Sequence, residues 1–359
     1  MSSPFISIDL GKIEANARTI TGLCGEHGIA VTGVTKGSCG FPEVARAMLR
    51  AGCTSIGESR IENIERLRAG GIDTPFMFLR GPSLSRVDEV VAHAQSSLNS
   101  EIAVISALAA AARRRAVVHD VIVMVDLGDL REGVWPDDLV AFVGELVDLK
   151  GIRIAGLGTS LTCFGGVIPT ATNMQQLVAL ADEVESAFDL ELEYVSGGSS
   201  SALPLIAAGT MPARINHVRI GEAILLGVET AHRTPWPGTC QDAFVLHAEV
   251  IELKTKPSIP VGEVSQDAFG KKPVFEDRGM IERAILNVGR EDVDVDGIRA
   301  LDPGVRILGA TSGALVVDVS DAGRTVRVGD LVRFSLNYAA LLQAMDSQYV
   351  EKRAVAGAG

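Results

Sequence analysis

An alternation of short apolar runs and amphipathic stretches, repeated from Ile29 to Glu222, constrains the fold of this 359-residue chain more than any other feature. The short runs are typical of buried strands, and the stretches between them carry apolar residues at helical spacing. Eight runs occur, in this order: Ile29–Thr35, Cys53–Glu58, Pro75–Gly81, Ser96–Ser100, Val121–Gly128, Ile152–Thr159, Leu192–Gly198 and Asn216–Gly221. Eight strands alternating with helices predict a closed (β/α)8 TIM barrel. A doubly wound open sheet is disfavoured, because no G-x-G-x-x-G motif opens a helix.

The pattern changes after Gly227, where helical periodicity is nearly absent and Gly, Pro and Asp turns separate strand-like segments. Two of these segments are Asp242–Glu263 and Arg324–Leu336. We therefore predict an α/β chain of two domains. A barrel domain covers residues 1–230 and carries the chemistry, and a β-rich C-terminal domain covers residues 231–359.

Composition narrows the class of protein. A net charge of −12 argues against nucleic acid or an anionic membrane as the main partner. No apolar run is long enough to span a bilayer, and the first ten residues lack the basic and apolar regions of a secretory signal. The five cysteines have no C-x-x-C spacing, and no histidine pairs with a cysteine at zinc spacing. We therefore expect a cytoplasmic protein without a disulfide framework and without a metal site.

Candidate functional residues follow from position, because chemistry in such a barrel lies at the C-terminal ends of the strands. Those ends carry Lys36, Glu58 to Arg60, Arg80, Asn99, Asp126 to Arg131, Thr159 to Cys163, Ser199 to Ser201, Arg219 and Gly221. This set contains one lysine. Its simplest interpretation is a side chain that reaches solvent or pairs with Glu58. Because the preceding strand is apolar on both sides, we instead expect its amine in the barrel mouth, where partial desolvation favours the neutral nucleophile that a Schiff base requires.

The seventh and eighth predicted strands end in residues suited to an anion. After two glycines, Ser199 to Ser201 add three hydroxyls, and Gly221 follows the next strand. Barrel enzymes commonly bind phosphate with the loops after strands seven and eight. A plain Gly/Ser turn with a helix-capping serine would explain this segment taken alone. Because Lys36 lies at the same end of the barrel, we favour a phosphate site.

Two arginines complete the set. Arg219 precedes Gly221 and could bond a ring nitrogen or pair with Glu222. Arg131 lies in the loop after strand five, where its fork of N–H donors suits a substrate carboxylate; pairing with Asp129 or Glu132 is the alternative. A lysine nucleophile, a phosphate cradle and an arginine for a ring nitrogen together predict pyridoxal 5′-phosphate (PLP) as the cofactor.

The chain also resembles a known family, through segments spread in order along almost its whole length. Among them are VTKGSCGFPEVARAMLRAG, IGESRIENIERLR, VDLGDLREGV, GLGTSLTCFGGVIP, VSGGSSSALP and HVRIGEAILLGVET. These segments are similar to those of fold-type III PLP enzymes of the alanine racemase-like family, and most similar to its ornithine racemase branch. The resemblance implies a racemase or epimerase that acts at Cα of a free amino acid, with an ornithine-like substrate. It also implies a head-to-tail homodimer in which each β domain completes the partner's site.

The resemblance also implies residue roles. Lys36 corresponds to the Schiff-base lysine, which serves as the base on one face of Cα, and Arg131 to the arginine that binds the substrate carboxylate. Arg219 corresponds to the arginine at the pyridine nitrogen. Phosphate ligands are expected at Ser199 or Ser200, at the Gly221 backbone and at Tyr338, and substrate contacts at Ser160 and Cys163.

The presumed second acid/base departs from the family pattern. The ornithine racemase branch implies an Asp-His pair where this chain has Gly313 and Ala314, and Arg290 corresponds to the tyrosine of alanine racemases. Cys39 or Cys163 could accept the proton instead, but inert packing of both cysteines is the favoured interpretation. The departures leave open a lyase, aldolase or decarboxylase on the same scaffold. A non-catalytic PLP carrier is disfavoured by the large β-rich domain.

Overall fold

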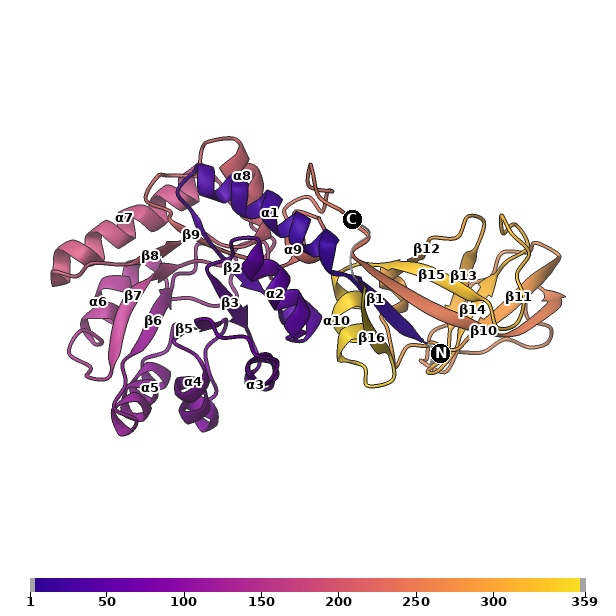
Figure 1. Cartoon of the computed structure of the whole chain (residues 1–359), viewed down its shortest axis with the longest axis horizontal. Helices are drawn as coiled ribbons and strands as arrows, with labels where there is room; N and C mark the ends of the chain where they lie inside the picture. Colours follow the sequence, from indigo (N-terminus) through magenta and orange to yellow (C-terminus); the bar gives the residue numbers. More distant parts are fainter. Residues whose placement is uncertain (1–3, 356–359) are drawn as a thin grey trace. The chain divides into compact units, whose positions relative to one another are not determined.

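The computed structural model describes residues 4–355, which form two compact units (Figure 1). One unit contains residues 10–241. The other combines residues 4–9 with residues 242–355. The described residues therefore start in the second unit, form the whole of the first, and then return to the second.

The unit of residues 10–241 is a closed barrel of eight parallel strands, as the alternating sequence pattern predicts. Its strands are β2 (Ala30–Val34), β3 (Ser55–Glu58), β4 (Phe76–Phe78), β5 (Ser96–Asn99), β6 (His119–Met124), β7 (Ile152–Gly158), β8 (Tyr194–Ser196) and β9 (His217–Ile220). Each strand pairs with the next, and β9 closes the barrel on β2 in the register Thr32 to Arg219. The last strand end therefore lies beside the first.

Helices surround these strands (Figure 1). They are α1 (Leu10–Glu26), α2 (Pro42–Arg50), α3 (Ile61–Ala69), α4 (Val87–His93), α5 (Ile102–Arg114), α6 (Leu139–Gly144), α7 (Ala171–Phe188), α8 (Leu203–Ala207) and α9 (Glu222–Leu225). Residues with suitable local chemistry begin these helices. Pro42 is the first residue of α2, where a backbone N–H would have no partner within the helix, so the missing N–H of proline costs nothing. Thr170 and Asn173 form a reciprocal capping box at α7. Buried apolar faces such as that of Leu177 and Ala181 then hold the helices on the barrel.

The second unit is built on an eight-stranded, mainly antiparallel sheet. Its strands are β1 (Phe5–Asp9), β10 (Phe244–Pro257), β11 (Met280–Leu286), β12 (Ile298–Ala300), β13 (Arg306–Ala310), β14 (Leu315–Asp318), β15 (Leu331–Leu336) and β16 (Glu351–Val355). The order is β12-β15-β10-β11-β14-β13, and β1 lies between β10 and β16. The predicted β-rich architecture is confirmed.

Two predictions about this unit are wrong in detail. The predicted barrel domain includes residues 5–9, but β1 buries Ile6 and Ile8 in the second unit, where it pairs with β10 and β16. The change from one unit to the other comes at Asp242 rather than at residue 231. The unit also contains a helix, α10 (Tyr338–Asp346), whose first turn is capped by the Asn337 side chain accepting from the Ala340 N–H.

Within residues 4–355, no helix is long and apolar enough to cross a bilayer. The same described residues contain no group of three or more His, Cys, Asp and Glu side chains arranged to hold a metal ion.

Candidate active site

Lys36 lies in a tight turn directly after β2. The carbonyl of Thr35 accepts hydrogen bonds from the N–H groups of Ser38 (2.9 Å) and Gly40 (3.2 Å), and from the Ser38 hydroxyl (2.9 Å). Gly40 has a φ of +62°, and a Cβ there would lie 2.8 Å from the Cβ of Asn63 on α3. The small residues after the lysine thus allow the turn to fold tightly against the next βα unit.

The Lys36 side chain is exposed, although both of its sequence neighbours are buried. The expectation that the barrel itself partly desolvates this lysine is therefore wrong. Its charge nevertheless acts on carboxyls at the two neighbouring strand ends: Glu58, the buried last residue of β3, and Glu222, a half-buried residue after β9. Burial raises the pKa of each carboxyl. Hydrogen bonds to Glu58 and the ion pair of Glu222 with Arg233 partly offset that increase, and the ammonium of Lys36 adds a smaller contribution in the same direction.

Glu58 is fully buried and is held by hydrogen bonds rather than by an ion pair with Lys36. Its carboxylate accepts from the Thr35 hydroxyl (2.8 Å), from Asn63 Nδ2 (3.1 Å) and from the Ser59 N–H (3.1 Å). The carboxylate therefore connects the residue before Lys36 to α3 and so positions the lysine turn.

The buried carboxyl gives a pH-dependent prediction. Because burial raises the pKa of Glu58 above 4.5, the folded chain binds this proton more tightly than the unfolded chain. The resulting stabilisation is complete below pH 4.5 and is lost as the pH rises through the raised value. The variant Glu58→Gln lacks this titration. Its free energy of unfolding, relative to wild type, should therefore increase with pH when urea denaturation is measured from pH 4 to 8. A difference that stays constant across this range would contradict the assignment.

Arg219 on β9 is almost completely buried, at 5% exposure. Its Nη1 donates to Ser196 Oγ on β8, and its Nη2 donates to the Thr159 carbonyl (2.7 Å) and to Ser160 Oγ (3.3 Å) after β7. Burial lowers its pKa to about 10, so it remains charged at neutral pH. The alternative partner, Glu222, pairs with Arg233 instead (2.8 Å).

A buried hydrogen-bond relay supports Arg219, and sequence reasoning missed it. Ser196 Oγ lies 2.8 Å from Nδ1 of His217, and Nε2 of His217 lies 2.7 Å from Thr32 Oγ1. Thr32 Oγ1 in turn lies 2.7 Å from Ser55 Oγ. Burial, together with the charge of Arg219, lowers the pKa of His217 to about 3, so the imidazole is neutral.

The direction of this relay follows from Arg219, which can only donate. Ser196 must accept from it, and its own hydroxyl proton then goes to Nδ1 of His217. The imidazole is consequently the Nε2–H tautomer and donates to Thr32. A charged histidine would have to donate from both nitrogens, which would leave the Ser196 proton without this acceptor. The relay therefore keeps the positive charge on Arg219.

The predicted phosphate cradle is assembled from the loops after β8 and β9. Ser200 Oγ accepts from the Ala223 N–H (3.1 Å), which connects the two loops, and the carbonyl of Gly198 accepts from the Arg219 N–H (2.9 Å). Gly198 has a φ of +112°, and a Cβ there would meet no atom within 4 Å, so a ligand can approach this backbone closely. A Cβ at Gly221 would lie 3.2 Å from the Cβ of Val34, which places the cradle beside β2, the strand that precedes Lys36.

Two unpaired polar atoms support a ligand in this mouth. Thr159 Oγ1 and Asn99 Oδ1 are buried and have no hydrogen-bond partner within residues 4–355. Thr159 is also the residue whose carbonyl binds Arg219. A buried cation, unpaired polar atoms and an accessible glycine backbone suit a polar, anionic ligand with a ring. The residues present thus fit PLP.

Asp129 is a second residue whose importance sequence reasoning missed. It is 1% exposed and accepts from the backbone N–H groups of Cys163 (3.2 Å), Phe164 (2.8 Å) and Val167 (3.0 Å). Burial acts to raise the pKa of this carboxyl, but the backbone donors outweigh it, so the pKa lies below its usual value. Asp129 therefore holds the Arg131 loop against the loop that carries Cys163.

Arg131 itself pairs with Glu132 at 2.6 Å, one of the two partners considered from sequence. Ser160 lies within the hydrogen-bonding set of Arg219, whereas the side chain of Cys163 is exposed. The barrel unit thus contains most of the predicted site residues: Lys36, Arg131, Ser160, Cys163, Ser199, Ser200, Arg219 and Gly221. Tyr338, at the start of α10, belongs to the other unit, and its phosphate role stays a prediction.

The position of the missing Asp-His pair has a structural counterpart in the β-rich unit. The Glu291 N–H donates to the Ser312 carbonyl (3.0 Å), so the two loops run together. A Cβ at Gly313 would lie 3.1 Å from Glu291 Oε1. A carboxylate from the neighbouring loop therefore lies beside the place where a side chain at residue 313 would begin. Arg290 stacks over Phe269, with 5.3 Å between its guanidinium carbon and the ring centre.

These features define a class of cofactor-dependent barrel enzymes. The parallel barrel has a lysine after its first strand and a Gly/Ser cradle after its last two strands, with a buried arginine beside the cradle. The family model "Alanine racemase, N-terminal domain" matches residues 8–228. The chain belongs to the alanine racemase family.

Known proteins resemble this chain over nearly its full length. It is 42% identical to the ornithine racemase of Acetoanaerobium sticklandii over 350 residues, covering 97% of this chain and 99% of the relative. It is 40% identical to the lysine racemase of Thermotoga maritima over 352 residues, covering 98% of each chain. The crystal structure of the alanine racemase of Bartonella henselae, which has covalently bound pyridoxal phosphate, superposes with a TM-score of 0.74 at 18% identity, over 99% of this chain and 100% of that one. That structural likeness concerns the fold.

Proposed function

We propose that this chain, a PLP-dependent amino-acid racemase, acts on a free amino acid with a basic side chain such as ornithine or lysine. The observation that carries the substrate class is the identity of about two residues in five, over nearly the whole chain, to an ornithine racemase and a lysine racemase. Lysine and ornithine share an α-amino acid group and differ by one methylene in the side chain. A lyase, aldolase or decarboxylase is not favoured, because both of these relatives are racemases.

The residues of the barrel mouth have separate roles in binding the cofactor, binding the substrate and transferring the proton. Lys36 holds the cofactor covalently and moves a proton to and from Cα on one face. Ser199, Ser200 and the Gly221 backbone hold the phosphate, with Tyr338 as a further predicted ligand. Arg131 binds the substrate carboxylate, and Ser160 and Cys163 contact the substrate. When bound, PLP makes the Cα proton acidic by spreading negative charge into its ring.

Arg219 sets the outcome of the reaction. Its guanidinium, which does not release a proton at working pH, would donate to the ring nitrogen of bound PLP. The buried relay through Ser196 and His217 keeps that charge in place. By leaving the ring nitrogen unprotonated, Arg219 would weaken the charge withdrawal that PLP supplies, which would favour return of the proton to Cα over transamination.

Inversion needs a second acid/base on the opposite face of Cα. Gly313 and Ala314 do not titrate, and Arg290 is a poor base. The family resemblance implies a head-to-tail homodimer in which the β-rich domain of one protomer completes the site of the other. That assembly, in a cytoplasmic setting inferred from composition, is part of the proposal.

The test is to incubate each enantiomer of a panel of amino acids with the PLP-loaded protein in deuterated water. We expect ornithine or lysine to lose optical rotation and to gain deuterium at Cα from either enantiomer. Mass spectrometry and polarimetry on the same sample measure exchange and inversion together. If no amino acid exchanges its α-proton, the racemase assignment fails. If exchange and inversion occur only with amino acids that lack a basic side chain, the substrate class is wrong.

A further inference from the structure

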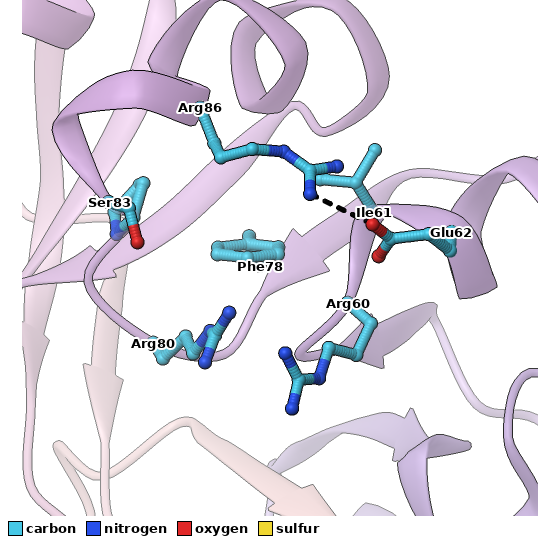
Figure 2. A pocket seen from close by; sticks show the side chains of 8 residues that line it. Arg60, Ile61, Glu62, Phe78, Arg80, Ser83 and Arg86 are labelled. Atoms are coloured by element: carbon cyan, nitrogen blue, oxygen red, sulfur yellow. Dashed lines mark hydrogen bonds and ion pairs between the residues drawn. The ribbon is translucent and has the colours of Figure 1, made fainter. Parts of the chain in front are cut away.

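A small pocket lies between the loops that follow β3 and β4, and it is bordered by three arginines, Arg60, Arg80 and Arg86 (Figure 2). The pocket is shallow: it is open to solvent, and its empty space is about 280 Å³ only when that open solvent is included. Figure 2 shows the Phe78 ring in the middle of the view, with Arg86 on one side of it and Arg60 and Arg80 on the other. A cluster of three cations is unexpected in a chain whose net charge is −12.

Among these three arginines, ion pairs within residues 4–355 are formed by Arg86 alone, although the charge of Arg60 also helps to lower the pKa of Glu62. Arg86 pairs with Glu62 at 2.8 Å and with Glu89 at 2.5 Å. The guanidinium groups of Arg60 and Arg80 make no hydrogen bond or ion pair within residues 4–355. Three arginines and two glutamates leave one positive charge in excess, next to two guanidinium groups that have no hydrogen-bonded or ion-paired partner among the described residues.

The pocket also has donors without acceptors. Arg86 Nε is buried and has no hydrogen-bond partner among the described residues, although its terminal nitrogens are paired. Arg80 is held over the Phe78 ring, with 5.9 Å between the guanidinium carbon and the ring centre. The protein therefore fixes one free guanidinium and leaves a buried N–H without an acceptor, both at the same pocket.

We propose that this pocket binds the carboxylate of a small organic acid, by Arg60 and Arg80. An excess of one positive charge matches a monoanion, whereas a phosphate dianion would exceed it and would lie close to Glu62. The planar fork of a guanidinium also matches the two oxygens of a carboxylate. Ile61 and Pro82 line the same pocket and can contact a short apolar remainder of the acid.

This site is separate from the cofactor cradle, yet it lies at the same end of the barrel. Arg60 and Arg80 each lie two residues beyond the last residue of their strands, as Lys36 does beyond β2. The cradle belongs instead to the loops after β8 and β9. The inference does not depend on the racemase activity, since it concerns equilibrium binding by residues that have no role in the proposed chemistry.

The test uses the PLP-loaded protein after borohydride reduction, which keeps the cofactor centre filled. We expect 3,3,3-trifluoropropionate to bind, as followed by line broadening in fluorine NMR at constant ionic strength. Arg60→Gln and Arg80→Gln should each weaken binding about tenfold, the loss expected for one charge-assisted hydrogen-bonding partner. Arg115→Gln, which removes one exposed positive charge at the far end of α5, should leave the affinity unchanged.

Three results would overturn the proposal. One is the absence of binding to the wild-type protein, and another is equal affinity in wild type, Arg60→Gln and Arg80→Gln. The third is equal binding of 3,3,3-trifluoropropylamine, which carries the opposite charge. Circular dichroism of each variant shows whether the fold is retained. Because no turnover is measured, failure of this test leaves the racemase assignment unaffected, and loss of racemase activity would leave this result standing.

Discussion

Replacing Lys36 with alanine should reduce racemisation by about 10⁴-fold or more, because one side chain supplies both the covalent attachment and the proton transfer on one face of Cα. Borohydride reduction of the wild-type protein should leave a pyridoxyl adduct on the peptide that contains Lys36. The same treatment of Lys36→Ala should leave none. Chiral chromatography of the product and peptide mass spectrometry measure the two effects.

The matched control is Lys150→Ala, which removes another exposed lysine of the barrel unit. Its activity and adduct should equal those of wild type. An adduct on any lysine other than Lys36 would refute the assignment of the cofactor site, as would full activity in Lys36→Ala.

Replacing His217 with leucine should lower the free energy of unfolding by about 3 kcal/mol, because the buried hydroxyls of Ser196 and Thr32 each lose a partner. His217→Gln should lose much less, since one amide can accept from Ser196 and donate to Thr32. Racemisation should fall in the same order, because Arg219 depends on Ser196. Urea denaturation and kcat measurements on both variants test this, and equal losses in the two variants would contradict the relay.

The relay also predicts a dependence on pH. The folded chain keeps His217 neutral, with a pKa of about 3, whereas the unfolded chain takes up this proton near pH 6.5. The stabilisation by neutral His217 is therefore complete above pH 6.5 and is lost as the pH falls below it. The stability advantage of wild type over His217→Gln should narrow between pH 7 and pH 4. Nitrogen NMR should identify the Nε2–H tautomer, and a ring that titrates near pH 6.5 would contradict the assignment.

The barrel could be predicted from sequence because its strands are buried on both faces and read as continuous apolar runs. Strand β1 could not be, since its partners β10 and β16 follow more than 230 residues later, and a five-residue run before a helix carries no sign of that pairing. Helix α10 was missed for a related reason: nine residues between strand-like segments contain too few turns to establish a helical period.

In the candidate site, too, some residues could be predicted from the sequence and others could not. Lys36, Ser200 and Arg219 could be chosen because they stand at strand ends, a property of position along the chain. The roles of His217 and Asp129 depend on which side chains meet across strands and loops. His217 is hydrogen-bonded to Thr32, which is 185 residues away in the sequence. Asp129 accepts hydrogen bonds from the backbone of a loop more than 30 residues further along the chain. No local pattern reports such contacts.

Strand β1 also determines the order in which the chain can be completed as it is synthesised. The five residues Phe5–Asp9 are made before any part of the barrel, but both of their neighbours in the sheet come after it. The barrel unit has all of its residues once position 241 has been made, whereas the β-rich unit needs the last strand, β16, before β1 is paired on both edges. During synthesis, β1 therefore has no sheet partner until β10 has been made, and such an unpaired edge strand can pair with another copy of the chain.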